Sequence, residues 1–161
     1  MHEVDRRGVE IISFFANPIF LSAFFSLFIT QLIKAIISLF RSKAKSLREV
    51  FVTLLWKTGG MPSSHAALTT SISTSIAIVD GINSSVFILS LFFCLVVIRD
   101  AMGVRRSAGM IARSLNLLGR ELSEKAGYNF RPVKEVNGHT PAEVVVGVLL
   151  GFFIGLAFTL L

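Results

Sequence analysis

The sequence is poor in charged residues, which make up 16% of its 161 residues, whereas apolar residues make up 53%. Because soluble proteins carry about a quarter charged residues, this balance excludes an ordinary soluble domain and indicates an integral membrane protein. The only cysteine, Cys94, excludes a disulfide framework and a cysteine metal site, and we expect it to be inert packing in an apolar run. No acidic cluster that could hold Mg²⁺ is present either, so we expect neither a metal nor another cofactor.

The positive net charge has a membrane explanation rather than a nucleic-acid one. A charge of +6 could indicate nucleic-acid binding, but the apolar composition argues against it, and basic loops are typical of the cytoplasmic side of membrane proteins. The length predicts a single domain, residues 1–161. Arg6 and Arg7 precede an apolar stretch, as in a signal peptide. No small-residue cleavage site follows and the stretch continues to Phe40, so we expect it to be retained.

Apolar runs and turn residues predict an all-α fold, an integral membrane helical bundle with about four spanning helices and one or two interfacial or amphipathic helices. We expect a short interfacial helix within residues 1–16, a half-buried turn over 49–56, and an amphipathic helix over 104–125 that lies along the surface or inside the protein near one membrane face. The four expected spans are residues 18–40, 64–79, 86–98 and 140–161.

Basic residues also predict the orientation in the membrane. The loops at 41–50 and 99–135 are basic, whereas the turn at 80–85 contains no lysine or arginine. The excess of positive charge in cytoplasmic loops therefore places both basic loops inside the cell and the short turn outside. We expect residence in the cell membrane if the protein is bacterial, with the polar candidate residues near the cytoplasmic face.

The most informative stretch is Lys57-Thr-Gly-Gly-Met-Pro-Ser-Ser-His65, which leads into an apolar helix. Backbone N–H groups at a helix start attract anions, and Gly60 allows backbone angles that other residues resist. His65 can hold or release a proton near neutral pH. The stretch is a candidate phosphate site, although Ser63 and Ser64 also suit ordinary helix caps and His65 alone could be structural.

A second histidine precedes the last helix, in His139-Thr-Pro-Ala-Glu143. A carboxylate one helical turn after a histidine can orient the ring, as in an activated nucleophile. The same residues also form a good capping box, with Thr140 as N-cap, Pro141 in the first turn and Glu143 as its partner. Local sequence favours the cap, and we expect Glu143 to serve both purposes only if the helix entry is irregular.

Other charged residues accompany the two histidines, and each has an ordinary explanation. Lys34 lies inside an apolar run, where it could extend to the interface, and Asp100 could pair with a nearby arginine. Arg105, Arg106 and Lys134 could be cytoplasmic anchors. Their conjunction at one membrane face suits phosphoryl transfer through a phosphohistidine, in which one imidazole attacks phosphorus and the other protonates the leaving alkoxide.

Three segments, 59–66, 100–106 and 134–143, resemble the type 2 phosphatidic acid phosphatase superfamily, which includes vanadium-dependent haloperoxidases and bacterial acid phosphatases. From about residue 20 onward the chain looks like a divergent membrane branch labelled acid phosphatase/vanadium haloperoxidase-related. The resemblance implies that His139 is the nucleophile, Glu143 orients it, and His65 is the acid on the leaving group. It also implies that Lys34 matches the lysine of the first family motif.

The chain departs from the family pattern at several of these positions. Ser64 stands where the family has glycine, Val133 where it has an arginine, and Glu143 where it has aspartate. Arg105, Arg106 or Lys134 would then supply the missing cation. We therefore expect a membrane lipid phosphate phosphatase acting on a phosphomonoester or a diphosphate. The alternative is a non-catalytic protein that binds or transports phosphorylated lipids or other anions.

Three glycines in the last predicted helix, Gly147, Gly151 and Gly155, are spaced four apart on one ridge. Such ridges let another helix approach the backbone closely. In a chain this small, the ridge predicts a possible homodimer. The expected partners are thus the lipid bilayer, a phosphorylated lipid and a second copy of the chain, with no nucleic acid.

Overall fold

The computed structural model describes residues 2–40, 60–135 and 138–161, and the regular structure in these ranges is helical. The expected turn at 49–56, as well as Lys57 and Gly59, lies outside the described residues. The all-α class is confirmed, and Pro18 starts a helix as predicted. The helices are α1 (His2–Phe15), α2 (Pro18–Phe40), α4 (Ser64–Val79), α5 (Ser85–Met102), α6 (Val104–Ala126) and α7 (Pro141–Leu160).

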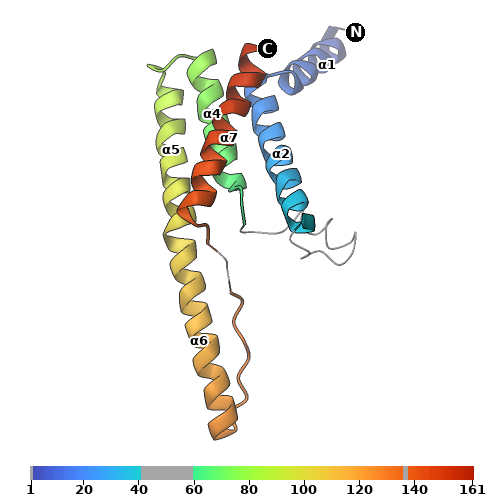
Figure 1. Cartoon of the computed structure of the whole chain (residues 1–161). Coiled ribbons are helices and arrows are strands. Elements are labelled where there is room, and N and C mark those ends of the chain that lie inside the picture. Colours follow the sequence, from blue (N-terminus) through green and yellow to red (C-terminus); the bar gives the residue numbers. More distant parts are fainter. Residues whose placement is uncertain (1, 41–59, 136–137) are drawn as a thin grey trace.

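Helix α4 lies at the centre of the bundle and packs against α2, α5 and α7 (Figure 1). Three described helices are long and apolar enough to cross a membrane: α2, the α5 part of the continuous α5–α6 helix, and α7. Residues 64–79, the remaining expected span, form α4, which has only 16 residues and does not reach this length. Along the chain, α4 follows α2 and precedes α5. It runs back through the bundle and is covered by its neighbours (Figure 1).

Small residues explain why α7 and α4 pack so closely. A methyl group at Gly147 would lie 2.5 Å from the carbonyl oxygen of Ser63, and one at Gly155 would lie 2.8 Å from that of Ser71. Gly151 faces the backbone of Ala67 in the same way. The glycine ridge is therefore used within one chain, and it no longer supports the homodimer that we inferred from it.

Polar side chains line the contact between α2 and α4. Ser22, Thr30, Lys34 and Ser38 are all buried along one face of α2. At one end of this face the Ser75 hydroxyl donates to Ser22 Oγ over 2.8 Å, and at the other end Lys34 Nζ donates to Ser64 Oγ over 3.2 Å. Lys34 is thus held inside the bundle by a hydroxyl partner and does not extend to the interface.

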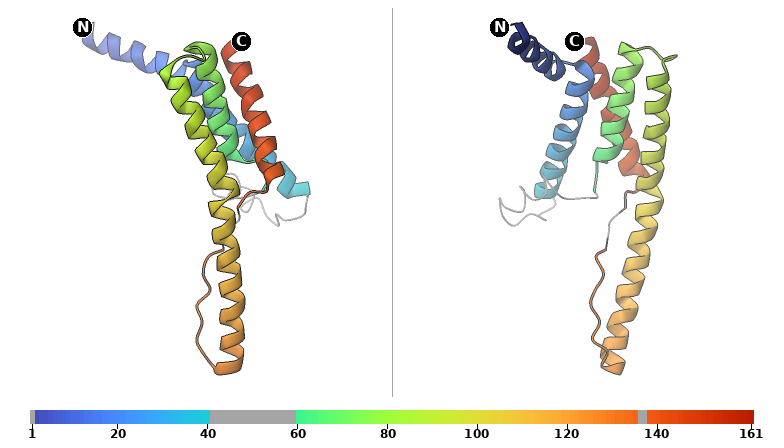
Figure 2. Two further views of the ribbon diagram at one scale, coloured as in Figure 1. Left: turned by 90° about the vertical axis from the view of Figure 1, so that its left-hand side faces the viewer. Right: turned by 180° about the vertical axis from the view of Figure 1, so that it is seen from behind.

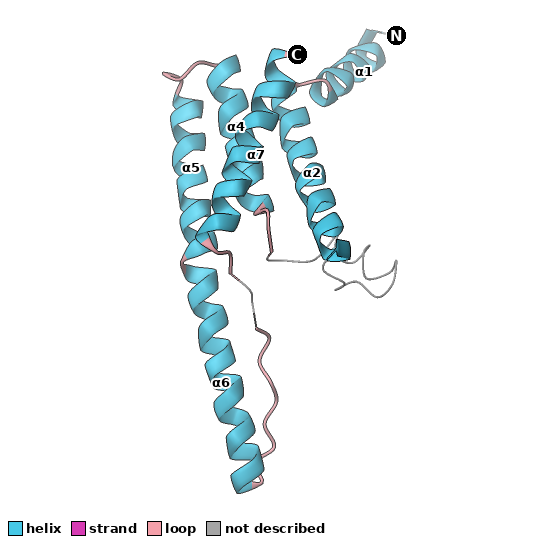
Figure 3. Ribbon diagram, in the orientation of Figure 1, coloured by secondary structure: helices cyan, strands magenta, loops and turns pink. Residues whose placement is uncertain are grey.

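Helix α5 exposes bulky side chains, as its sequence predicts for a lipid-facing helix: Leu89, Phe92, Phe93 and Val96 are each more than half exposed. Helix α6 follows after Gly103 alone and continues in the direction of α5, away from the bundle (Figures 1 and 2). A helix that continues the line of α5 does not lie along a face that α5 crosses, and most residues of α6 are exposed rather than inside the protein, so neither placement expected for residues 104–125 is found. The segment after α6 then runs back beside it toward α7 (Figure 3).

Candidate active site

Four helix ends meet at the end of the bundle from which α6 projects: the end of α2, the start of α4, the end of α5 and the start of α7 (Figure 1). Backbone hydrogen bonds tie the ends of α4, α5 and α7 together. Ser63 N donates to Glu143 O over 3.0 Å, and His139 N donates to Ala101 O over 3.1 Å. The electropositive N-terminal ends of α4 and α7 are thereby placed side by side, which favours an anion.

His139 is buried directly before α7, with 5% of its surface exposed. Its Nδ1 lies 3.1 Å from Glu143 Oε2. A carboxylate at this distance holds the proton on Nδ1 and leaves the lone pair on Nε2 free. The ring is therefore oriented as a nucleophile requires, with Nε2 as the reactive atom.

The same carboxylate also caps α7. Glu143 Oε2 accepts from Thr140 N over 3.1 Å, and Thr140 Oγ1 accepts from Glu143 N over 3.4 Å, which completes a capping box. The expectation that Glu143 could serve both purposes only at an irregular helix entry was wrong. Because His139 directly precedes the N-cap, a regular capping box brings the carboxylate to both groups.

At the start of α4 the two serines have different tasks. Ser63 is the N-cap, its hydroxyl accepting from Ala66 N over 3.4 Å, and Gly60 takes a positive φ of 83° in the preceding turn. Ser64 is buried and its hydroxyl accepts from Lys34 Nζ. The side chain that stands where the family has glycine therefore positions the lysine, so a glycine here would leave the ammonium without this partner.

His65 is the second residue of α4, outside the three candidate spans, and it is exposed. Partial burial lowers the pKa of His65 below its ordinary value of about 6.5, and the charges of Arg105 and Lys34 lower this pKa further. A bound phosphate dianion would oppose these charges and favour the protonated imidazole.

The remaining predicted residues lie at different distances from the histidines. Asp100 and Arg105 form an ion pair, with Arg105 Nε 2.7 Å from Asp100 Oδ2, at the junction of α5 and α6. Arg106 is exposed, and its backbone packs against Gly138, directly before His139. Of these two arginines, Arg105 is the one whose charge lowers the pKa of His65.

Lys134 is not brought to the histidines. Its neighbour Val133 exchanges two 2.8 Å hydrogen bonds with the Asn116 amide, and Glu135 accepts a third from Asn116 Nδ2 over 2.9 Å. Asn116 lies eleven residues after Arg105, which corresponds to about 16 Å along a helix. The structure therefore separates Lys134 from the cluster that includes Arg105, because its segment is fastened further along α6.

The sequence did not predict two contacts that hold segments near the site. The carbonyl of Ala101 anchors His139, and no pattern in the sequence could indicate a contact made by a backbone atom. Asn116 holds the returning segment against α6, and Phe130 covers Gly119 beside it. Asn116, the only amide side chain of α6, was the available signal for the second contact.

The fold and the site define a class: this is a helical integral membrane protein with a carboxylate-oriented histidine at the meeting point of four helix ends. A family model described as "Divergent PAP2 family" matches residues 15–154, and the chain belongs to this family. The resemblance predicted from the three motifs is thus confirmed.

One curated relative supports the membrane assignment. The chain is 38% identical over 120 residues to the "Uncharacterized membrane protein YuiD" of Bacillus subtilis (strain 168). This alignment covers 68% of the chain and 76% of the relative. No solved structure matches the chain significantly.

Proposed function

We propose that this protein is a lipid phosphate phosphatase that hydrolyses a phosphomonoester or a diphosphate through a phosphohistidine, without a metal ion. The observation that carries the proposal is the buried His139, whose Nδ1 is held by Glu143 at the electropositive starts of α4 and α7. The capping box explains why Glu143 lies here, but it does not require the buried ring of His139 to contact that carboxylate.

The reaction has two steps. His139 Nε2 attacks phosphorus and forms an N–P bond while the bond from phosphorus to the leaving oxygen breaks, and His65 donates a proton to that oxygen. Water then attacks the phosphohistidine, the N–P bond breaks, and His65 takes the proton from the water. Phosphate leaves and both imidazoles return to their starting states.

The charge on the transferring group would be met by cations and helix ends. Lys34 approaches from α2, where Ser64 holds its ammonium group, and Arg105 approaches from the start of α6, where Asp100 holds its guanidinium group. The N–H groups at the start of α4 supply further donors. In-line attack by His139 would require His65 to protonate the leaving oxygen from the opposite side.

We further propose that this end of the bundle faces the cytoplasm. Of the 16 lysines and arginines, only Arg6 and Arg7 lie in α1, and the other 14 lie between Lys34 and Lys134. The described members of that group lie at or beyond the end of the bundle that holds the histidines (Figure 1). An excess of this kind is typical of cytoplasmic segments.

Phosphate release by the purified protein tests the proposed function directly. We expect detergent-solubilised protein to release inorganic phosphate from lipid monophosphates or diphosphates in the presence of excess EDTA, because the proposed chemistry uses no metal. Water-soluble phosphomonoesters serve as the comparison for the lipid requirement. A complete absence of release across the panel would contradict the proposal.

Replacing Glu143 with glutamine separates its two tasks. Glutamine can still accept from Thr140 N and complete the capping box, so we expect the thermal stability to change little. The neutral amide no longer enforces a proton on Nδ1 of His139, so we expect the rate of phosphate release to fall by about 10²- to 10⁴-fold. Paired melting curves and rate measurements check this. Equal losses of stability and rate would show that Glu143 acts only as a cap.

One observation favours the alternative, a protein that binds or moves phosphorylated lipids without turnover. Lys134 is held beside Asn116 and Arg105 is already paired with Asp100, so fewer cations face the histidines than the sequence suggested. Saturable binding of lipid phosphates by a wild-type protein that releases no phosphate would establish this alternative.

A further inference from the structure

Six apolar residues of α6 recur at alternating intervals of four and three, while Met110 and Leu117 lie outside this series. We call these six positions the α6 stripe: Val104, Ala108, Ile111, Leu115, Leu118 and Leu122. This alternation is the a/d pattern of a coiled coil, in which two helices interlock through such residues. The pattern covers nearly the whole length of α6.

The α6 stripe is exposed, because α6 projects away from the bundle. The exposed fractions are 66% for Val104, 68% for Ile111, 46% for Leu115, 55% for Leu118 and 47% for Leu122. Of the described helices, only α5 packs against α6. Soluble surfaces seldom leave so continuous an apolar patch uncovered, so the stripe marks an interaction surface.

The returning segment of the same chain covers a different face. It contacts Asn116 through hydrogen bonds and Gly119 through the ring of Phe130, and these residues, with Ala112, are the buried positions of α6. They lie beside the stripe on the helix. A second helix can therefore occupy the stripe without displacing the returning segment.

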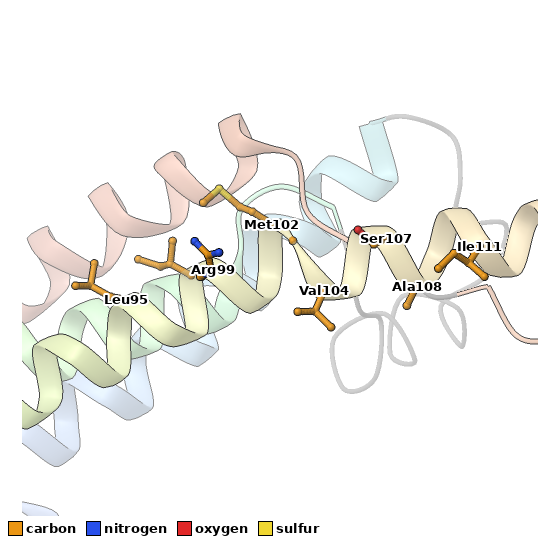
Figure 4. Close-up of a pocket in the computed structure, with 9 residues that line it drawn as sticks. Leu95, Arg99, Met102, Val104, Ser107, Ala108 and Ile111 are labelled. Atoms are coloured by element: carbon orange, nitrogen blue, oxygen red, sulfur yellow. The ribbon is translucent and has the colours of Figure 1, made fainter.

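Where α6 leaves the bundle, the stripe opens into a cleft. The cleft has a volume of about 870 Å³ and is lined by Val104, Ala108 and Ile111 of α6 together with Leu95 and Met102 of α5 (Figure 4). The apolar surface thus extends from α6 onto the last turns of α5, where Arg99 also lines the cleft. A long partner helix that also continues from a membrane span would match this shape.

Charge and orientation identify the occupant. Arg106, Arg113 and Arg120 are spaced seven apart, at the positions opposite the stripe, so these three arginines of two such helices do not face one another. The central flanking positions, Ser107 and Ser114, are uncharged. Two copies in one bilayer also have the same orientation, so their α6 helices are automatically parallel.

We propose that α6 forms a parallel, two-stranded coiled coil with α6 of a second copy of this chain. The interface is the α6 stripe, related to itself by a two-fold axis perpendicular to the membrane. It is distinct from the glycine ridge of α7, which is occupied by α4. The proposal is independent of whether the site turns over phosphate.

Disulfide cross-linking of the full chain in membranes tests this proposal. In a Cys94→Ala background, single cysteines are introduced at Leu115, Leu118 and Ala108, which lie on the stripe, and at Arg113, which lies opposite. Oxidation is expected to give a band at twice the 17.6 kDa of one chain for the three stripe positions and not for Arg113. Ala108 lies near one end of α6, so it can pair with itself only in the parallel arrangement.

The other outcomes overturn the proposal. Equal cross-linking at Arg113 and the stripe would indicate random collision, whereas no cross-linking at Leu115 and Leu118 would indicate that another molecule or the bilayer covers the stripe. Cross-linking at Leu115 without Ala108 would indicate an antiparallel pair. As a second measurement, light scattering in detergent should give a dimer for the wild type and a monomer for the Leu115→Lys, Leu118→Lys double variant; a monomeric wild type overturns the proposal.

Discussion

Replacing His139 with alanine is expected to abolish phosphate release, with a loss of at least about 10⁴-fold, because the step that forms the N–P bond then has no nucleophile. Lys34 and Arg105, the cations proposed to hold the phosphate, are unchanged in this variant. We therefore expect the affinity for lipid phosphates to change by less than about tenfold. Rate and equilibrium binding measured on the same preparation separate the two effects.

The covalent intermediate gives a second readout of the same prediction. Brief incubation of the wild type with a lipid carrying labelled phosphate should label the protein with a phosphoramidate, which is stable in base and labile in acid. The label should be absent from the His139→Ala variant. Arg113→Ala, a change on the outer face of α6, is the matched control and should keep both label and rate. Unchanged release by the His139→Ala protein would exclude the mechanism.

Replacing Gly151 with leucine is expected to have the largest effect on stability. A side chain at Gly151 meets the backbone of Ala67, which cannot move aside without separating α7 from α4. Overpacking of this kind costs about 3 kcal/mol or more, and the rigid neighbour here is a helix backbone. Because α4 and α7 also hold Ser63 against Glu143, the site should be lost with the packing.

Thermal unfolding in detergent checks this second prediction. Ala157→Leu is the matched control, because it adds the same side chain to an exposed position of α7 that is more distant from α4. We expect the control to melt within a few degrees of the wild type and Gly151→Leu to melt far lower or to fail to accumulate. Equal melting temperatures for the two variants would show that the close approach of α4 and α7 is not needed.

Local patterns made most of the helices predictable. Pro18 starts α2, Thr140 and Glu143 form the predicted capping box, and the apolar run that predicted a lipid-facing helix is α5. These features depend on residues within one or two turns of each other. Propensity, capping and hydrophobic pattern act over that range, so a single sequence contains the necessary information.

The errors share another physical cause, since each concerns what a segment contacts. The sequence showed that Gly147 and Gly155 allow close packing, but not that α4 of the same chain is the partner. It showed that α6 is amphipathic, but not that it continues in the direction of α5. Lys134 looked close to His139 along the chain, yet the hydrogen bonds of Asn116 hold its segment elsewhere.

By itself, the sequence determined that this is a helical membrane protein of the divergent PAP2 family, with His65, His139 and Glu143 near helix starts. Composition and short motifs suffice for that, because they act through the solvent preference and the geometry of a few neighbouring residues. Only the tertiary structure decided that Ser64 holds Lys34 and that the Ala101 carbonyl anchors His139. Those contacts join residues about 30 or more positions apart, and only the packing of α4 against its neighbours brings them within hydrogen-bonding distance.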